Sequence, residues 1–483
     1  MMRYGRRKML IGGEWVSGAR SELFPTSDPG KGEVLAEVAR GSEEDIHQAV
    51  SAAQSALDQS WWTSEHPRKR AQVLHRIGER LRARAEELAI MESLDSGKPL
   101  RQARQDMESS AQYFEFYAGV ADKLYGHTIP MGQRSLNYTV REPVGVTAHI
   151  TPWNFPLAVA TRGIAPSLAA GNTVVHKPAE QTPLTALELG KIALEAGLPA
   201  GVLNVIPGFG AEAGAALAKH PGIHHLTFTG SVETGTRVMQ MAAENVVPVT
   251  LELGGKSPNI VFADATLEPA IKGALQAIFQ NAGQTCSAGS RLLVEESVHD
   301  RFVATLAKET EQLHLGYGLT DPDLGPIISE EQLERVLSYL DIGKREGATV
   351  VTGGTRAADG ELQHGFFVRP TLFDNVQNSM RIAQEEIFGP VLTILTFGDP
   401  EEALQIANDN PYGLVAGIWT RDISKAHALA ARLKAGQVYI NNYFGGGVAA
   451  PFGGYKKSGF GREKGLEALA HYTQVKNVYV AID

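Results

Sequence analysis

The chain contains one cysteine, Cys286, in the short segment 283–287, GQTCS, between an apolar helical run and a strand-like run. A catalytic cysteine needs reach, partial exposure and hydrogen-bond donors for its thiolate, and a turn of small residues supplies these better than a core does. On these local features a nucleophile and an inert buried thiol are equally good interpretations. With one cysteine, an internal disulfide and a cysteine-rich metal site are both excluded.

A second candidate for chemistry is Glu252, which stands between two leucines at the end of a strand-like run and before a Gly-Gly turn. A carboxylate in such surroundings is poorly solvated, which raises its pKa toward the working pH and suits a general base. The alternative is a glutamate that forms a salt bridge at a domain junction.

Three other segments place polar groups where strand-like runs end. Asn154 lies in a loop between prolines, and its amide could donate to a developing oxyanion. Lys177 and Glu180 follow the next run, at the edge where open α/β sheets bind ligands. The turn at Gly230 and Ser231 precedes a helix start and could hold a pyrophosphate, although Ser231 could equally be a simple N-cap.

These residues belong to two sets of short apolar runs that alternate with helical segments, which predicts two α/β domains with open, mostly parallel sheets. The first 120 residues are dominated by charged helical segments, including one helix over 67–95 that ends before Gly97. The predicted strands are 144–150, 173–176, 202–206, 225–229, 247–251 and 259–262 in the first set, and 291–294, 349–352, 391–397, 414–419 and 437–441 in the second.

Two more strand-like runs, 137–141 and 474–480, lie outside both sets and predict an arm of β-strands that pairs with another subunit. The 483 residues carry a net charge of −9, which argues against a nucleic-acid partner and favours a small-molecule substrate. No apolar run approaches the roughly 18 residues of a membrane span. No hydrophobic signal-peptide core follows the basic N-terminus, so the chain is predicted to be cytoplasmic.

Together these segments resemble the aldehyde dehydrogenase superfamily over nearly the whole chain, from 11–15 (IGGEW) to 458–463 (SGFGRE). The resemblance implies oxidation of an aldehyde to its acid, with NAD as cofactor and no metal, through a thioester on Cys286. Glu252 then resembles the general base of the family. Asn154, with the backbone N–H of Cys286, resembles its oxyanion hole.

The resemblance also implies a set of contacts to the cofactor. Glu180 in the ribose-binding position would repel the 2′-phosphate of NADP, so NAD is the expected cofactor and NADP the less favoured one. Val232 stands where a threonine is common, and Ser231 remains for the pyrophosphate. The implied contacts are Trp153, Lys177, Glu180, Gly230, Ser231, Glu386 and Phe388.

The same resemblance implies that the chain has three parts and that it forms a homodimer or homotetramer. The expected cofactor-binding domain comprises residues 1–122 and 144–251, the catalytic domain residues 252–465, and the oligomerisation arm residues 123–143 and 466–483.

The substrate is indicated by positions where the chain departs from many relatives. Arg162, in a Thr-Arg pair that resembles semialdehyde dehydrogenases, offers a planar fork suited to a substrate carboxylate, unless it pairs with a protein carboxylate instead. Gln280 replaces the second basic residue of succinic-semialdehyde enzymes, which argues against that substrate. A longer or unsaturated semialdehyde, or one with another polar group, could use the open loop at 445–447. Gly163 replaces a lysine that is thought to relay protons.

Two other functions remain as alternatives. An acylating relative would pass the thioester to coenzyme A, but such enzymes usually lack the glutamate base that Glu252 supplies. A catalytically silent binding protein on the same fold is disfavoured because Cys286, Glu252 and Asn154 are all retained.

Overall fold

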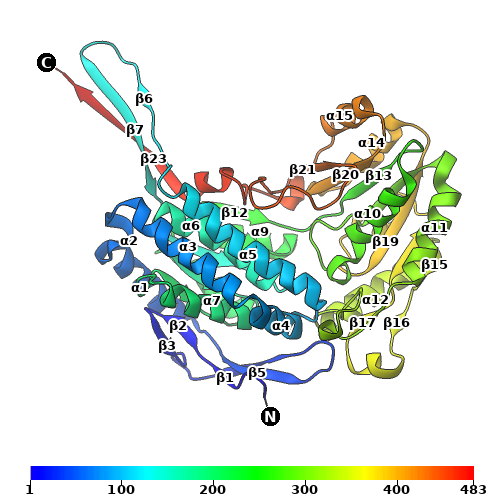
Figure 1. Ribbon diagram of the computed structural model, residues 1–483, viewed down its shortest axis with the longest axis horizontal. Helices are drawn as coiled ribbons and strands as arrows, with labels where there is room; N and C mark the ends of the chain where they lie inside the picture. The colour runs from blue at the N-terminus through cyan, green and yellow to red at the C-terminus, as the bar shows by residue number, and fades with distance from the viewer. Residues whose placement is uncertain (1, 483) are drawn as a thin grey trace.

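A computed structural model of the protein describes residues 2–482 and consists of two halves, each built on one large sheet, with an arm that projects from the first half (Figure 1). The mixed α/β class with two mostly parallel sheets confirms the predicted fold.

The first half contains an eight-stranded sheet in the order β22-β12-β11-β8-β9-β10-β2-β3. Its five central strands are parallel, and β22, β2 and β3 pair antiparallel at the two edges. The central strands are buried along almost their whole length, as expected for a parallel sheet covered on both faces. The strands are β2 (Met9–Ile11), β3 (Glu14–Val16), β8 (Val146–Ile150), β9 (Thr173–Lys177), β10 (Leu203–Val205), β11 (His225–Thr229), β12 (Val249–Glu252) and β22 (Gly459–Phe460).

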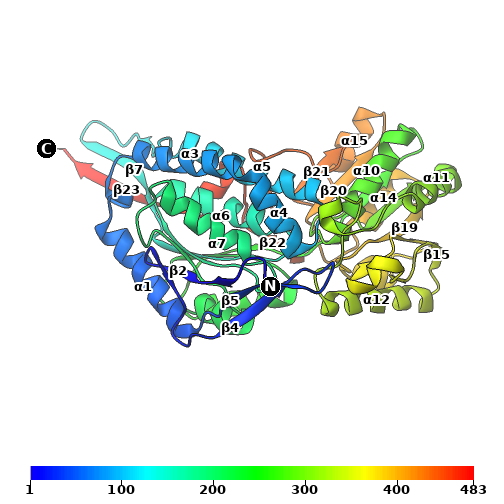
Figure 2. The same cartoon turned by 60° about the horizontal axis from the view of Figure 1, so that its bottom comes forward.

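Helices cover both faces of this sheet (Figure 2). Adjacent residues Val174 and Val175 of β9 belong to different hydrophobic clusters, since successive strand side chains point to opposite faces. One face carries α3 (Pro67–Ala83), α4 (Ala85–Ser96), α5 (Leu100–Val120), α6 (Pro156–Ala170) and α7 (Leu184–Glu195), and the other carries α1 (Glu43–Gln59), α8 (Ala215–Ala218) and α9 (Val232–Ala243).

The N-terminal region differs from its prediction. The single helix predicted over 67–95 is two helices, because the backbone of Arg84 leaves the helical region between α3 and α4. Gly97 ends α4 in the left-handed conformation, which glycine adopts most easily. Short strands β1 (Arg6–Arg7), β4 (Leu23–Ser27) and β5 (Val34–Ala39) form a small sheet that the helical interpretation of this region missed.

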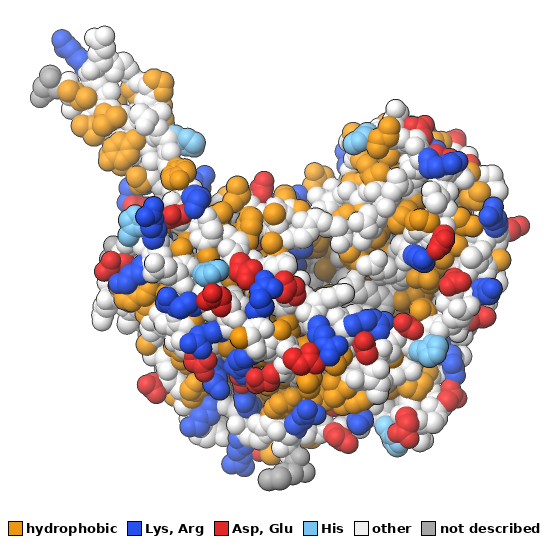
Figure 3. All heavy atoms as spheres, in the orientation of Figure 1, with side chains coloured by type: hydrophobic (Ala, Val, Ile, Leu, Met, Phe, Trp, Pro, Cys, Tyr) orange, Lys and Arg blue, Asp and Glu red, His pale blue; other side chains and the backbone are white. Residues whose placement is uncertain are grey.

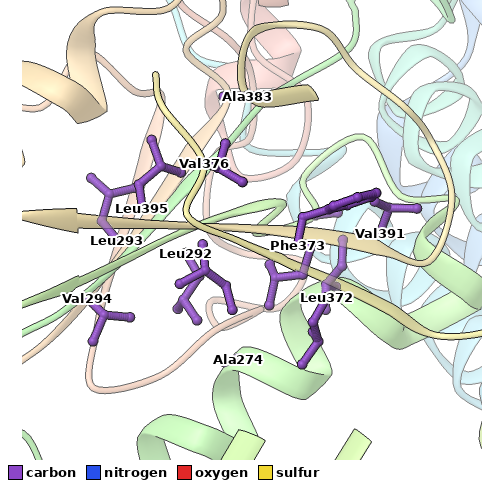
Figure 4. Packing of buried hydrophobic residues seen from close by; sticks show 14 of the residues in the cluster. Ala274, Leu292, Leu293, Val294, Leu372, Phe373, Val376, Ala383, Val391 and Leu395 are labelled. Atoms are coloured by element: carbon purple, nitrogen blue, oxygen red, sulfur yellow. The ribbon is translucent and has the colours of Figure 1, made fainter. Parts of the chain in front are cut away.

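The second half contains a seven-stranded sheet in the order β15-β18-β19-β14-β13-β20-β21, in which only β15 is antiparallel. Figure 4 shows its core, where Leu292 of β14 and Phe373 of β18 pack near Ala274 of helix α10 (Leu267–Phe279). The strands are β13 (Pro258–Val261), β14 (Arg291–Glu295), β15 (Thr349–Thr352), β18 (Thr371–Asp374), β19 (Val391–Phe397), β20 (Val415–Trp419) and β21 (Gln437–Ile440). The main helices beside it are α11 (His299–Glu311), α12 (Glu330–Arg345), α14 (Pro400–Asn408) and α15 (Ile423–Ala430).

After β21 the chain returns to the first half, where β22 pairs with β12 and places Gly459 opposite Glu252. The catalytic domain predicted over 252–465 therefore contributes an edge strand to the first sheet. The predicted domain boundaries are otherwise untested and stay a prediction. None of the helices within residues 2–482 is long and apolar enough to cross a membrane.

The projecting arm is a three-stranded sheet of β6 (Thr128–Ile129), β7 (Ser135–Pro143) and β23 (Thr473–Ala481). The two strands that were predicted to pair with another subunit pair with each other over nine residues, which satisfies their facing backbone groups within the chain. Hydrophobic side chains gather on the surface of the arm (Figure 3), and Leu136, Val475 and Tyr479 are exposed there. A contact between arms of two subunits stays a prediction.

Candidate active site

A cavity of about 610 Å³ lies where loops of the second half meet the carboxyl ends of β8, β11 and β12. The ends of parallel strands are where open α/β sheets bind ligands, so the topology itself brings candidate groups together. The predicted residues that line the cavity are Trp153, Asn154, Arg162, Gly230, Ser231, Glu252, Gln280, Cys286, Glu386 and Phe388.

The loop that carries Cys286 is held in an unusual backbone conformation. After α10 the chain passes through Asn281, Ala282 and Gly283, all with φ between 51° and 73°. A Cβ atom on Gly283 would lie 2.0 Å from the carbonyl oxygen of Gly389, so only glycine fits this close approach. The loop is therefore fixed against the second half, and Cys286 sits half-buried on the cavity wall.

Asn154 ties the first half to this loop. Its Nδ2 donates to the carbonyl of Gln284 at 2.9 Å, and the Nδ2 of Asn281 donates to the carbonyl of Asn154 at 2.9 Å. The amide group thus lies beside the segment of Cys286, whose own backbone N–H meets no acceptor among residues 2–482. An oxyanion hole made by these two donors stays a prediction.

The thiol of Cys286 is uncharged in this structure. Burial raises its pKa to about 11, the carboxylates Glu386 and Glu252 act in the same direction, and Arg162 opposes them. Because the thiolate is the reactive form, a base must remove the proton when substrate is bound.

Glu252 ends β12 and is 2% exposed. Neither of its carboxylate oxygens has a hydrogen-bond partner among residues 2–482. Burial and the neighbouring Glu463 raise its pKa well above 4.5, although Arg162 lowers it in part. Buried carboxylates are usually satisfied by protein partners, so two free oxygens at a cavity wall mark a group that is available to accept a proton.

Arg162 of α6 lines the cavity and forms an ion pair with Glu463, with both side chains buried. Burial lowers the pKa of Arg162, but Glu463 and Glu252 raise it further, so the guanidinium is charged. Glu463 is thus a protein carboxylate that pairs with Arg162, which was the alternative to a substrate carboxylate. A substrate contact of Arg162 stays a prediction.

Gly163 lies against a buried histidine. A Cβ atom there would lie 2.7 Å from Nδ1 of His149, so a longer side chain fits only if its neighbours move. Burial lowers the pKa of His149 well below 6.5 and keeps the imidazole neutral. The position therefore supplies no charged group beside Glu463.

The other end of the cavity contains Trp153, Phe388 and Glu386. The rings of Trp153 and Phe388 meet edge to face with centroids 5.3 Å apart. Oε1 of Glu386 accepts the N–H of Gly255 at 3.0 Å, and a Cβ atom on Gly254 would lie 2.1 Å from Oε2. Glycines thus let the backbone approach this carboxylate closely, while burial raises its pKa to about 7.

Residues 15–478 match the sequence model of the Aldehyde dehydrogenase family. The chain belongs to this family. It is 48% identical to the betaine aldehyde dehydrogenase of Bacillus subtilis, covering 98% of this chain and 96% of the relative. It is 44% identical to the NADP/NAD-dependent aldehyde dehydrogenase PuuC of Escherichia coli, covering 99% and 96%. An NAD⁺ complex of the aldehyde dehydrogenase of Bacillus cereus superposes with a TM-score of 0.97 at 47% identity, covering 99% and 97%.

Three predicted cofactor residues of this family member lie at the edge of the cavity or beyond it. Lys177 and Glu180 form an ion pair at 3.1 Å at the end of β9 but do not line the cavity. Ser231 lines it and also caps α9, since its Oγ accepts the N–H of Thr234 at 3.2 Å. The structure is therefore compatible with both interpretations of Ser231, the N-cap and the pyrophosphate contact.

Lys464, which lines the cavity one residue beyond the last family motif, was not predicted as a site residue. The cavity also has an aromatic wall. Tyr439 of β21 with Phe444 and Phe452 of the loop that follows lie in the cluster beside Cys286, and Tyr113 of α5 adds a fourth ring to the lining. Tyr113 is more than 300 positions from the other three, so no spacing in the sequence connects it with them.

Proposed function

We propose that this aldehyde dehydrogenase oxidises its substrate through a thioester on Cys286, with NAD as cofactor and Glu252 as the base. The observation that carries the proposal is that one cavity joins the only thiol of the chain to a buried carboxylate with two unpartnered oxygens. A nucleophile and a base facing the same space are what a two-step acyl transfer requires.

The residues at the far end of the cavity fit a dinucleotide. Glu386 lines the cavity, and its carboxylate can accept hydrogen bonds from ribose hydroxyls, while Phe388 and Trp153 offer ring surfaces for a nicotinamide. Lys177 and Glu180 extend the binding surface along the strand ends toward an adenosine ribose. When bound there, NAD supplies the acceptor for the two electrons and the hydrogen that the aldehyde loses.

The first half of the reaction uses Cys286 and Asn154. The thiol loses its proton to a water molecule, and Sγ bonds to the carbonyl carbon. The carbonyl oxygen becomes an oxyanion, and Nδ2 of Asn154 and the N–H of Cys286 stabilise it. The oxyanion collapses as the carbon loses its hydrogen, which leaves a thioester on Sγ.

The second half uses Glu252. Its carboxylate removes a proton from a water molecule, the water oxygen bonds to the thioester carbon, and the C–S bond breaks to release the acid and the thiolate. The raised pKa of Glu252 makes it a stronger base than an exposed glutamate.

An assay of NADH absorbance together with acid release, with and without coenzyme A, tests this proposal. We expect acid to be released without coenzyme A. Turnover that requires coenzyme A would establish the acylating alternative, and the absence of any turnover over a broad set of aldehydes would establish the silent binding protein.

We further propose that the arm joins subunits into a homodimer or homotetramer. Exposed apolar side chains on a sheet that projects from its own domain are typical of an interface. Light scattering on the full chain and on Val475→Lys/Tyr479→Lys tests this, since two charged residues on the arm should shift the assembly toward monomers.

A further inference from the structure

Lys464 presents a charged group to the substrate end of the cavity. Its side chain is half-buried, and its ammonium has no hydrogen bond or ion pair with any residue from 2 to 482. Nζ lies 5.1 Å from the ring centroid of Phe452, a weak attraction that leaves the donors of the ammonium unused.

The backbone holds this side chain in place at a cost. Lys464 has φ 60°, a left-handed conformation that is uncommon for any residue other than glycine. Paired backbone hydrogen bonds between Phe452 and Glu463, of 2.7 and 2.8 Å, fix the residue before it. A strained residue maintained by its surroundings at a cavity wall is typical of a functional position.

The other ionisable groups near Lys464 carry no net charge. Arg162 and Glu463 compensate each other as a buried pair. Burial and Glu463 raise the pKa of Glu252, which favours its uncharged form, and the pKa of Cys286, about 11, keeps it a thiol. Burial and Arg162 lower the pKa of Lys464 to about 8, which still leaves it mainly protonated at pH 7.

The substrate end of the cavity therefore carries one uncompensated positive charge, in surroundings where aromatic side chains limit screening by water. Cys286 packs against the cluster that contains Phe452, and the ammonium of Lys464 lies beside the Phe452 ring, so this ring lies near both groups. The neighbouring loop, whose Val448 carbonyl accepts the N–H of Gly465, leaves open space, because a Cβ atom on Gly447 would meet nothing within 4 Å. A flexible substrate can extend from the thiol along Phe452 to the ammonium.

We propose that Lys464 binds an anionic group of the substrate, a carboxylate at the far end from the aldehyde, and that it disfavours substrates with a cationic group. The proposal rests on the aldehyde oxidation proposed above and names its substrate class. It assigns to Lys464 the role that the sequence predicted for Arg162, whose charge Glu463 already neutralises. Betaine aldehyde, which carries a quaternary ammonium, is accordingly a poor substrate despite the 48% identity to the Bacillus subtilis enzyme.

The test compares kcat/KM for 6-oxohexanoate, hexanal and betaine aldehyde in the wild type, Lys464→Met and Lys464→Arg. Methionine keeps the length of the stem without its charge, and arginine keeps the charge. We expect the wild type to prefer 6-oxohexanoate over hexanal and Lys464→Met to reduce that ratio by roughly 10–150-fold, mainly through KM. Lys464→Arg should retain most of the ratio. Lys457→Met, an exposed lysine of the same segment, is the control and should leave the ratio unchanged.

The pH dependence gives an independent readout. Lys464 loses its charge as pH rises through about 8, so the wild-type preference for 6-oxohexanoate should fall over that range while the preference of Lys464→Arg persists. The groups that face it, Arg162, Glu463, Glu252 and Cys286, are unchanged in Lys464→Arg, so the comparison of the two pH profiles isolates the titration of Lys464.

Two results would overturn the inference: a wild type that oxidises hexanal as well as 6-oxohexanoate, or a Lys464→Met variant that loses both substrates equally. In either case aldehyde oxidation itself stands. A wild type that oxidises none of the three substrates would instead contradict the proposed function.

Discussion

The two ends of the cavity are built in different ways. At the cofactor end, Trp153 and Ser231 lie just beyond the ends of adjacent parallel strands, and Glu252, which faces Arg162 and Lys464, ends the next strand, so the first sheet fixes all three positions. At the substrate end, Phe444, Phe452 and Lys464 come from the chain that returns after β21. We infer from this difference that the first sheet determines the reaction. The loops after β21, which are distant in sequence, determine which aldehyde is accepted.

The largest expected effect comes from the thiol, which serves both ends of the cavity. Cys286→Ala should abolish aldehyde oxidation because no other cysteine can form the thioester, while NAD affinity stays within about threefold of wild type. Turnover is measured by NADH absorbance and NAD binding by calorimetry. Substantial oxidation by this variant would show that the reaction does not pass through Cys286.

The next effect sharpens the role of the strand ends. Glu252→Gln should slow acid release by roughly 10²–10⁴-fold because an amide cannot accept the proton of water. In the wild type the carboxyl is protonated below its raised pKa, so activity should increase with pH as the base form appears. The amide that this substitution introduces does not titrate, so the variant should lose that limb of the pH profile. Unchanged acid release would make Glu252 a structural residue.

At the substrate end, Arg162→Leu should lower the free energy of unfolding by about 3–5 kcal/mol, since it leaves Glu463 buried without its partner. Urea denaturation measures the loss. Arg237→Leu is the matched control, because that arginine pairs with Glu233 on the surface with 70% and 78% of the two side chains exposed, and it should cost less than about 1 kcal/mol. Equal stability of the two variants would mean that the buried pair contributes nothing.

The smallest expected effect concerns the choice of cofactor by Glu180, which lies beyond the cavity. Glu180 should make kcat/KM for NAD about tenfold or more higher than for NADP, because a carboxylate near the ribose repels a 2′-phosphate and ~1.4 kcal/mol corresponds to tenfold. Glu180→Gln should reduce the ratio of kcat/KM for NAD to kcat/KM for NADP. A wild type that uses both cofactors equally would show that the pairing of Glu180 with Lys177 cancels the repulsion.

The sequence predicted what periodicity and local motifs encode. Most strands of both large sheets were located within two residues, because alternating apolar runs and helices define them. The short strands β2, β3, β18 and β22 were not predicted, since two to four residues leave little periodic signal. The run at 259–262 was assigned to the first set, but it is β13 of the second sheet. The break at Arg84 also lacks a local signal, because no glycine or proline marks it.

The residues of the candidate site also fall into two groups, those predicted from local motifs and those revealed only by the fold. Cys286, Glu252 and Asn154 stand in short motifs, and the structure brings them to one cavity as the resemblance implied. The pairing of Arg162 with Glu463 joins residues about 300 positions apart, and only the fold reveals it. Lys464 follows a recognised motif directly, but its unpaired ammonium depends on charges contributed by other segments.

The central claim is most directly tested by the mass of the intermediate. Glu252→Gln, mixed with NAD and an aldehyde and quenched in acid, should accumulate protein whose mass is increased by that of the aldehyde less two hydrogen atoms, with the added acyl group on the peptide that contains Cys286. Cys286→Ala under the same conditions should gain no mass. If the Glu252→Gln protein forms NADH without any acylated Cys286, the thioester mechanism is wrong.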